Sequence, residues 1–198
     1  MLFYTFCLIS LQISFMKNFA ANKIWLITGL IFLAVIIRVL LYPFNFSPII
    51  AIALFSGAVI KDKKIAFLLP LLAMFLSDVI FEVFNIAEGF WGWGQLVGYA
   101  ILIAITFLGS FINKINFPKV AGFSIASSLI FFLLSNASVW LLYSGMYENS
   151  FSGLVSCIAA GVPFLKINLV ADLVYSGLFF GTYEFVRRNS LSLSQAVI

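Results

Sequence analysis

The sequence contains no histidine, and only 9% of its residues are charged. Without histidine the chain has no histidine-ligated metal site, no Ser–His or Cys–His nucleophile pair and no histidine switch near neutral pH. It also has no GxxxxGK[ST] loop, so any energy from ATP would come from partner proteins. Cys7 and Cys157 are too few for a disulfide scaffold and form no CxxC motif. We therefore expect no enzyme activity of its own, no metal and no cofactor.

Apolar residues dominate the composition. They make up 64% of the chain, against about 45–50% in a soluble domain, and the mean hydropathy is +1.16. The sequence therefore predicts an all-α integral membrane protein. A membrane span needs about 20 mostly apolar residues. Six candidate spans form one predicted transmembrane domain over residues 17–188, at about 24–42, 48–60, 65–84, 95–112, 120–143 and 167–186.

Three segments lie outside these spans. Residues 1–16 are apolar and precede a Met–Lys pair, so they are either an over-extended start or an additional apolar arm. Residues 151–166 contain Gly161 and Pro163 and are too short for a span, which favours an interfacial or re-entrant helix. Residues 189–198 are expected to form a cytoplasmic tail. Within the spans, Ser47 and Pro48 predict a helix start, and Pro70 predicts a kink.

Lysine and arginine residues predict the orientation, because cytoplasmic loops are enriched in them. With a cytoplasmic N-terminus only Lys166 lies in an outer loop, and the C-terminal tail is also cytoplasmic. The basic residues that would then be inside are Lys17, Lys23, Lys61, Lys63, Lys64, Lys114, Lys119, Arg187 and Arg188. The net charge of +4 is thus explained by topology signals and needs no nucleic-acid partner.

Polar residues within the predicted spans gather toward the outer face. Ionisable residues in a span are costly and mark a site by default, and at 1.5 Å per residue these fall within about 10 Å of the outer helix ends. The candidate substrate-binding residues in the spans are Arg38, Asp78, Glu82, Asn136, Trp140, Asp172 and Tyr175. A structural alternative is that Arg38 neutralises Asp78 or Asp172. Trp91, another candidate, is more typical of an aromatic belt than of a stacking platform.

Three stretches resemble known proteins. They are NFSPIIAIALFSGAVIKDKKIAFLLPLLAMFLSD, FFLLSNASVWL and CIAAGVPFLKINLVADLVYSGLFFGTYE. They resemble an uncharacterised bacterial family of six-helix transport-type proteins and, more distantly, the substrate-binding S subunits of energy-coupling factor (ECF) vitamin transporters. The resemblance implies a location in the bacterial inner membrane and a ligand site near the outer face. This site would lie under residues 42–47, which add Asn45 to the candidates, and under 144–166. It also implies a transmembrane coupling protein and ATPase subunits as partners.

The preferred hypothesis is a membrane subunit that captures a small water-soluble micronutrient. An ion-coupled carrier using Asp78, Glu82 or Asp172 is an alternative, although the sequence has no inverted repeat. An aspartyl hydrolase built on Asp78 and Asp172 and a structural or assembly role are further alternatives. The surplus of carboxylates favours a cationic or polyhydroxylated ligand, but Arg38 could equally hold an acid group.

Overall fold

The computed structural model describes residues 28–29, 32–33, 35–41, 46–143 and 145–195. The predicted arm 1–16 and the candidate Asn45 lie outside the described residues. The regular elements are helices, which confirms the predicted all-α class for the described chain. Residues 35–40 are helical, and the helices that follow are α2 (Ile49–Val59), α3 (Lys63–Val83), α4 (Trp93–Gly109), α5 (Phe117–Leu142) and α6 (Phe151–Gln195).

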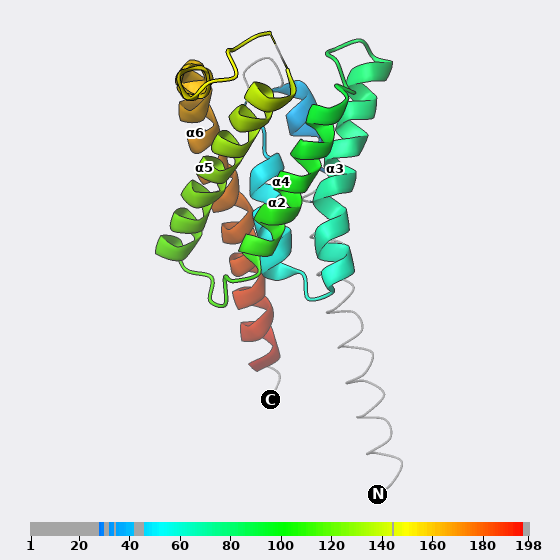
Figure 1. The fold of residues 1–198 in the computed structure, drawn as a ribbon. Coiled ribbons are helices and arrows are strands. Elements are labelled where there is room, and N and C mark those ends of the chain that lie inside the picture. The colour runs from blue at the N-terminus through cyan, green and yellow to red at the C-terminus, as the bar shows by residue number, and fades with distance from the viewer. Residues whose placement is uncertain (1–27, 30–31, 34, 42–45, 144, 196–198) are drawn as a thin grey trace, which may run out of the picture.

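Three of these helices have the length and composition of membrane spans. They are Lys63–Val83, Phe117–Leu142 and the Phe151–Arg188 part of α6. Their outward faces carry large exposed apolar side chains, including Leu68, Leu72 and Phe75 of α3. Exposed apolar surface of this extent is typical of contact with lipid or with another protein. Figure 1 shows α3, α4 and α5 running in alternating directions beside the second part of α6.

Helix α2 forms the centre of the bundle. Every residue from Ile49 to Gly57 is buried, as expected for a helix that is apolar on all sides. It contacts α3, α4, α5 and α6. With 11 residues it is about 16 Å long, which is about half of the roughly 30 Å hydrocarbon core. The predicted span 48–60 therefore corresponds to a helix that is too short to cross a membrane by itself.

Two glycines allow α2 and α4 to pack at backbone distance. A Cβ atom added at Gly57 would lie 1.9 Å from the Thr106 carbonyl oxygen, and one at Gly109 would lie 2.3 Å from the Leu54 carbonyl oxygen. Glycine is the residue that permits so close an approach. The α2–α4 contact therefore fixes the position of α2 within the bundle.

Side-chain caps define the starts of α3 and α5. The Asp62 carboxylate accepts hydrogen bonds from the backbone N–H groups of Lys64 at 2.9 Å and Ile65 at 3.4 Å. The Asn116 side chain accepts from the N–H of Lys119 at 3.0 Å. Such caps satisfy backbone donors that a helix start leaves unpaired. At α2 the predicted boundary shifts by one residue, since Pro48 is the N-cap and Ile49 is the first helical residue.

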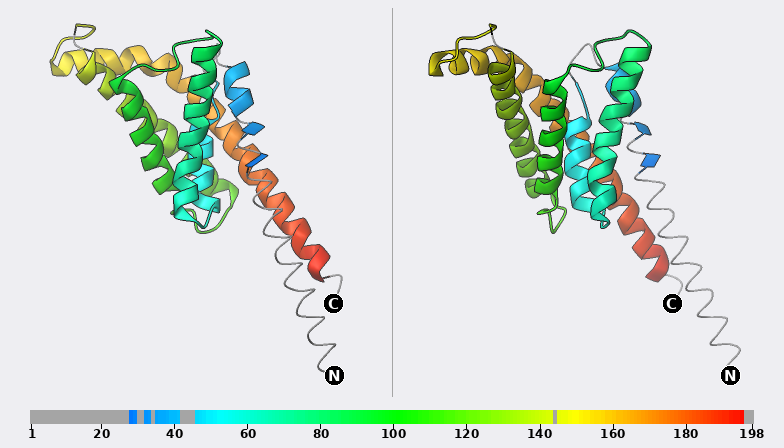
Figure 2. Two further views of the ribbon diagram at one scale, coloured as in Figure 1. Left: turned by 90° about the vertical axis from the view of Figure 1, so that its right-hand side faces the viewer. Right: turned by 45° about the vertical axis from the view of Figure 1, so that its right-hand side comes forward.

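Helix α6 joins two segments that the sequence analysis separated. Residues 151–166, the predicted span 167–186 and the first residues of the predicted tail form one helix ending at Gln195. Figure 2 shows that its first part lies across one end of the bundle and its second part runs along the bundle. Pro163 lies inside this helix and cannot donate a backbone hydrogen bond, which favours a bend. The first part of α6 thus covers one end of the bundle, and it is a continuous helix with the second part. We call it the end-covering part of α6.

The two ends of the bundle differ in charge. We call the end formed by residues 60–62, residues 110–116 and the C-terminal part of α6 the basic end (Figure 1). At or next to it lie Lys61, Lys63, Lys64, Lys114, Lys119, Arg187 and Arg188. The opposite end, formed by residues 84–92, 143 and 145–150, carries Glu88 and Glu148.

Candidate functional site

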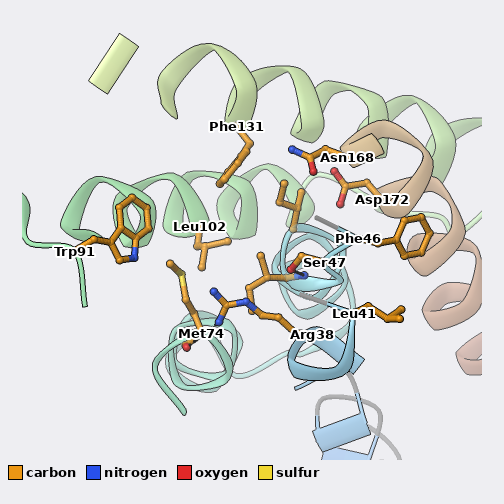
Figure 3. Close-up of a pocket in the computed structure, with 13 residues that line it drawn as sticks. Arg38, Leu41, Phe46, Ser47, Met74, Trp91, Leu102, Phe131, Asn168 and Asp172 are labelled. Carbon is orange, nitrogen blue, oxygen red and sulfur yellow. Dashed lines mark hydrogen bonds between the residues drawn. The ribbon is translucent and has the colours of Figure 1, made fainter. Parts of the chain in front are cut away.

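A cavity of about 240 Å³ lies at the N-terminus of α2. Its walls come from the second half of α3, the first half of α4, the second half of α5 and the middle of α6, so it occupies the half of the bundle away from the basic end. Figure 3 shows the polar side chains among its mostly apolar lining. The lining residues are Arg38, Leu41, Phe46, Ser47, Ile49, Ile50, Met74, Trp91, Gly98, Leu102, Phe131, Asn168 and Asp172.

Arg38 is held against α3 by several contacts. Its Nη1 atom lies 2.9 Å from Oδ1 of Asp78 and donates to the Met74 carbonyl oxygen at 3.2 Å. It also donates to the Ser77 hydroxyl. The guanidinium lies 5.1 Å from the centre of the Phe81 ring, within the range of a cation–π contact. Arg38 thus joins the N-terminal helical residues to α3 while lining the cavity.

Both carboxylate oxygens of Asp78 have partners. Oδ1 faces Arg38, and Oδ2 accepts a hydrogen bond of 3.0 Å from Nε2 of Gln95 on α4. The same Nε2 donates to the Tyr99 hydroxyl at 3.0 Å. Asp78 is only 1% exposed and is not a lining residue of the cavity. A buried carboxylate with this set of partners fits the structural alternative, in which Asp78 neutralises Arg38.

Asp172 has different surroundings. It is also 1% exposed, but it lines the cavity. Its Oδ2 atom accepts a hydrogen bond of 2.5 Å from the Ser128 hydroxyl of α5. In the described parts of the chain, no lysine or arginine lies within ion-pair distance of it. Asp172 is therefore a buried acid without a basic partner among those residues.

Asn168 extends the polar wall on α6. It precedes Asp172 by one helical turn, so the two side chains share a face, and both line the cavity (Figure 3). Its amide has no hydrogen-bond partner among the described residues. The sequence analysis missed Asn168, although its spacing of four from Asp172 was a usable signal. It missed Ser128 as well, because a serine in an apolar helix usually bonds to its own backbone.

Trp91 and Tyr175 lie on opposite sides of the cavity region. Trp91 lines the cavity from the connection between α3 and α4. Tyr175 is buried beside the lining residue Phe46, with ring centres 5.2 Å apart. Its hydroxyl donates to the Phe46 carbonyl oxygen at 3.5 Å. Tyr175 therefore holds the segment before α2 against α6 and is not itself a lining residue.

The other candidates lie away from the cavity. Nδ2 of Asn136 donates to the Phe132 carbonyl oxygen at 2.7 Å, and Asn136 packs against Gly161 of α6. Nε1 of Trp140 donates to the Glu148 carbonyl oxygen at 2.9 Å. These two residues fasten the first part of α6 and the connection before it to α5.

Glu82 lies on the surface at the end of α3. One of its carboxylate oxygens accepts a hydrogen bond of 3.1 Å from the N–H of Gly89, so it stabilises the connection between α3 and α4. The structure thus brings Arg38, Trp91 and Asp172 together at one cavity, places Asp78 behind Arg38, and separates Glu82 from this group.

The arrangement suits reversible binding of a small molecule. Ligand cavities are mostly apolar with a few polar groups that fix orientation, and Arg38, Asn168 and Asp172 supply these groups. Asp78 and Asp172 each have their own partners, whereas a catalytic dyad shares a proton between its carboxylates. In the residues that the structure describes, no three His, Cys, Asp or Glu side chains are grouped to bind a metal ion.

Comparisons with known proteins give a family without a function. Neither the curated proteins nor the solved structures include a match to the chain. The profile of a family of unknown function, DUF6580, matches residues 18–195. This match covers all the helices and every described residue that lines the cavity. Because it extends over most of the chain, the protein belongs to the DUF6580 family.

Proposed function

We propose that the protein is a membrane subunit that captures a small water-soluble solute, such as a vitamin-like micronutrient, and is not itself an enzyme. The observation that carries this proposal is the cavity of about 240 Å³ with Arg38, Asn168 and Asp172 in its apolar wall. Ligand cavities commonly measure about 300–1,000 Å³, so its size suits a small solute. Ionisable side chains inside a bundle of apolar helices are costly, and they mark a candidate site by default.

The proposed orientation places the basic end in the cytoplasm of a bacterial cell, with the bundle in the inner membrane and both termini inside. The seven basic residues at that end, against Lys166 on the other side, support this orientation. The cavity then lies in the outer half of the membrane, where a solute from outside would reach it first. Cysteines introduced at Asn113 and Asn149 test the orientation with an impermeant thiol reagent on intact cells, in a background without Cys7 and Cys157. We expect labelling at position 149 alone, and labelling at 113 alone would reverse the orientation.

The resemblance to ECF S subunits suggests which partner proteins the capture subunit would have. The cavity is bounded by Phe46 and Ser47, which precede α2, and by Asn168, which follows the end-covering part of α6. These regions adjoin the segments under which that likeness expects the ligand. We therefore propose a transmembrane coupling protein and ATPase subunits as partners, since the chain has no nucleotide-binding loop.

A second candidate function is a proton-coupled carrier. A buried polar series behind Asp172 favours it: Ser128 donates to Asp172 at 2.5 Å, and Ser176 donates to Ser124 at 3.3 Å. These serines lie between the cavity and the basic end. Under this alternative, Asp172 exchanges a proton during transport.

Native mass spectrometry tests the capture function. Purified protein in detergent is equilibrated with a small-molecule extract of bacterial cells and desalted, without any ion gradient. We expect a bound mass that is absent from Gly98→Leu, because Gly98 lines the cavity and a larger side chain there would fill it. Gly122→Ala serves as the control, because a Cβ atom added at Gly122 would meet no atom of another element within 4 Å. An identical bound mass in Gly98→Leu, or none in the wild type, would contradict capture in this cavity.

A vesicle experiment separates capture from the carrier. The protein is reconstituted alone into lipid vesicles, and uptake of the compound identified in the extract is followed under an imposed proton gradient. The capture function predicts binding without accumulation. Accumulation driven by the proton gradient alone would favour the carrier.

A further inference from the structure

One ionisable group at the cavity is left without a partner of opposite charge. Nη1 of Arg38 and Oδ1 of Asp78 lie 2.9 Å apart and form an ion pair, whereas Asp172 lines the cavity without a basic partner among the described residues. Asp172 is 1% exposed and has only the Ser128 hydroxyl as a partner among the described residues. Isolating an ionised carboxylate from water costs several kcal/mol unless an opposite charge accompanies it. Such an acid is stabilised either by taking up a proton or by pairing with a cation, and the described residues supply no such cation.

We propose that the cavity is built for a small organic monocation whose ammonium group sits against Asp172 and Asn168. This inference rests on the proposed capture function and specifies its substrate class. An ammonium group has three donors and no acceptor. Oδ1 of Asp172, which accepts no hydrogen bond from the described residues, and the amide oxygen of Asn168 are acceptors on one wall, as Figure 3 shows. The Phe131 ring also lines the cavity and offers a cation–π contact.

The other end of the solute faces Arg38. Only Nη1 of this guanidinium is engaged in the contacts to Asp78, Met74 and Ser77, and a guanidinium carries five N–H donors. Its donors that have no partner among the described residues suit a hydroxyl or carbonyl oxygen. The N-terminus of α2, where Ile49 and Ile50 line the cavity, adds about half a positive charge. This partial charge would offset only part of the charge of an ionised Asp172, so a net cation fits better than a zwitterion or an anion.

Four probes of similar size test the charge preference at pH 7 on the full-length protein in detergent. They are ethanolamine, which is a cation, ethylene glycol, which is neutral, glycolate, which is an anion, and glycine, which is a zwitterion. Binding is measured by saturation-transfer NMR and by the shift in melting temperature. We expect ethanolamine to bind at least about tenfold more tightly than each other probe, the scale of a hydrogen bond to a charged group.

Variants then assign the preference to Asp172. Asp172→Asn keeps the size of the side chain and should weaken ethanolamine binding about tenfold, which removes the preference. Asn168→Asp adds an acid to the same wall and should strengthen ethanolamine binding, so the test does not depend on one variant folding. Glu88→Gln removes an exposed acid from the same half of the protein and should change nothing.

The outcomes separate this inference from the capture function. A wild-type protein that prefers ethylene glycol, glycolate or glycine, or that binds no probe, overturns the monocation. A preference for ethanolamine that persists in Asp172→Asn also overturns it, as does equal binding of all four probes, which is the result expected of a neutral Asp172 carboxyl. The capture function is decided separately by the bound mass from the cell extract and its loss in Gly98→Leu.

Discussion

Asp78 and Asp172 are equally buried, at 1% exposure each, but their surroundings differ. Asp78 faces a guanidinium and a side-chain amide, so its charge is compensated within the protein. Asp172 receives one hydroxyl hydrogen bond and faces the cavity. Burial alone therefore does not distinguish a structural acid from a binding acid. The proposed distinction rests on the partners of the two carboxylates: Asp78 pairs with a guanidinium, whereas Asp172 has only a hydroxyl partner among the described residues.

Removing the arginine should produce the largest effect. Arg38→Gln leaves Asp78 buried without its counter-charge, and breaking a buried ion pair from one side costs about 3–5 kcal/mol. We expect a sharp fall in the melting temperature of the ligand-free protein in detergent. The double variant Arg38→Gln/Asp78→Asn should recover most of the loss. A double variant as unstable as the single one would show that the pair is not what stabilises this region.

A second prediction tests the close packing of α2 against α4, because the cavity lies at the N-terminus of α2. Gly57→Ala puts a Cβ 1.9 Å from the Thr106 carbonyl oxygen, and such overpacking costs about 1–3 kcal/mol. Because α2 must move to relieve the clash, thermal stability and solute binding should fall together. Gly122→Ala is the control, since its Cβ meets nothing within 4 Å and alanine favours the helix by about 1 kcal/mol. Unchanged stability in Gly57→Ala would contradict the close α2–α4 contact.

The smallest effect is expected at Glu82. Its carboxylate accepts one side-chain hydrogen bond, from the Gly89 N–H, near the surface. Water can replace the carboxylate there, so Glu82→Gln should change the free energy of unfolding by less than about 1 kcal/mol. Binding of the extract solute should also be unchanged, as measured by native mass spectrometry. A clear loss of binding would extend the site beyond the cavity and weaken the contrast between the two buried acids.

The sequence predicted the helices better than their contacts. The spans predicted at 65–84, 95–112 and 120–143 lie within a few residues of α3, α4 and α5, because long apolar runs and polar connections mark such helices. It left open whether Arg38 pairs with Asp78 or Asp172, since depth in a span follows from chain position but rotation of the helix depends on packing. The continuity of α6 through Pro163 was not predictable, because contacts such as Asn136 against Gly161 support it.

Only part of the candidate site could be predicted, because chain position gives the depth of a residue in a span but not the direction in which its helix faces. Charged residues stand out in an apolar chain, so the sequence analysis selected Arg38 and Asp172, which the structure places at the cavity. An amide such as Asn168 does not stand out, and its place in the cavity depends on the rotation of α6. Conversely, Asn136 and Trp140 lie at the expected level of the bundle but make contacts between α5 and the start of α6.

One crossed measurement tests the central claim most directly: the melting temperatures of Asp78→Asn and Asp172→Asn, each without and with the solute identified from the cell extract. We predict that Asp78→Asn melts well below the wild type without solute, because it strands Arg38, yet is still stabilised when solute is added. Asp172→Asn should melt near or above the wild type without solute, because it removes a buried acid that has no basic partner among the described residues, and should gain little from the solute. The reverse pattern, in which Asp172→Asn loses stability and Asp78→Asn loses the response to solute, would contradict the assignment of the two acids.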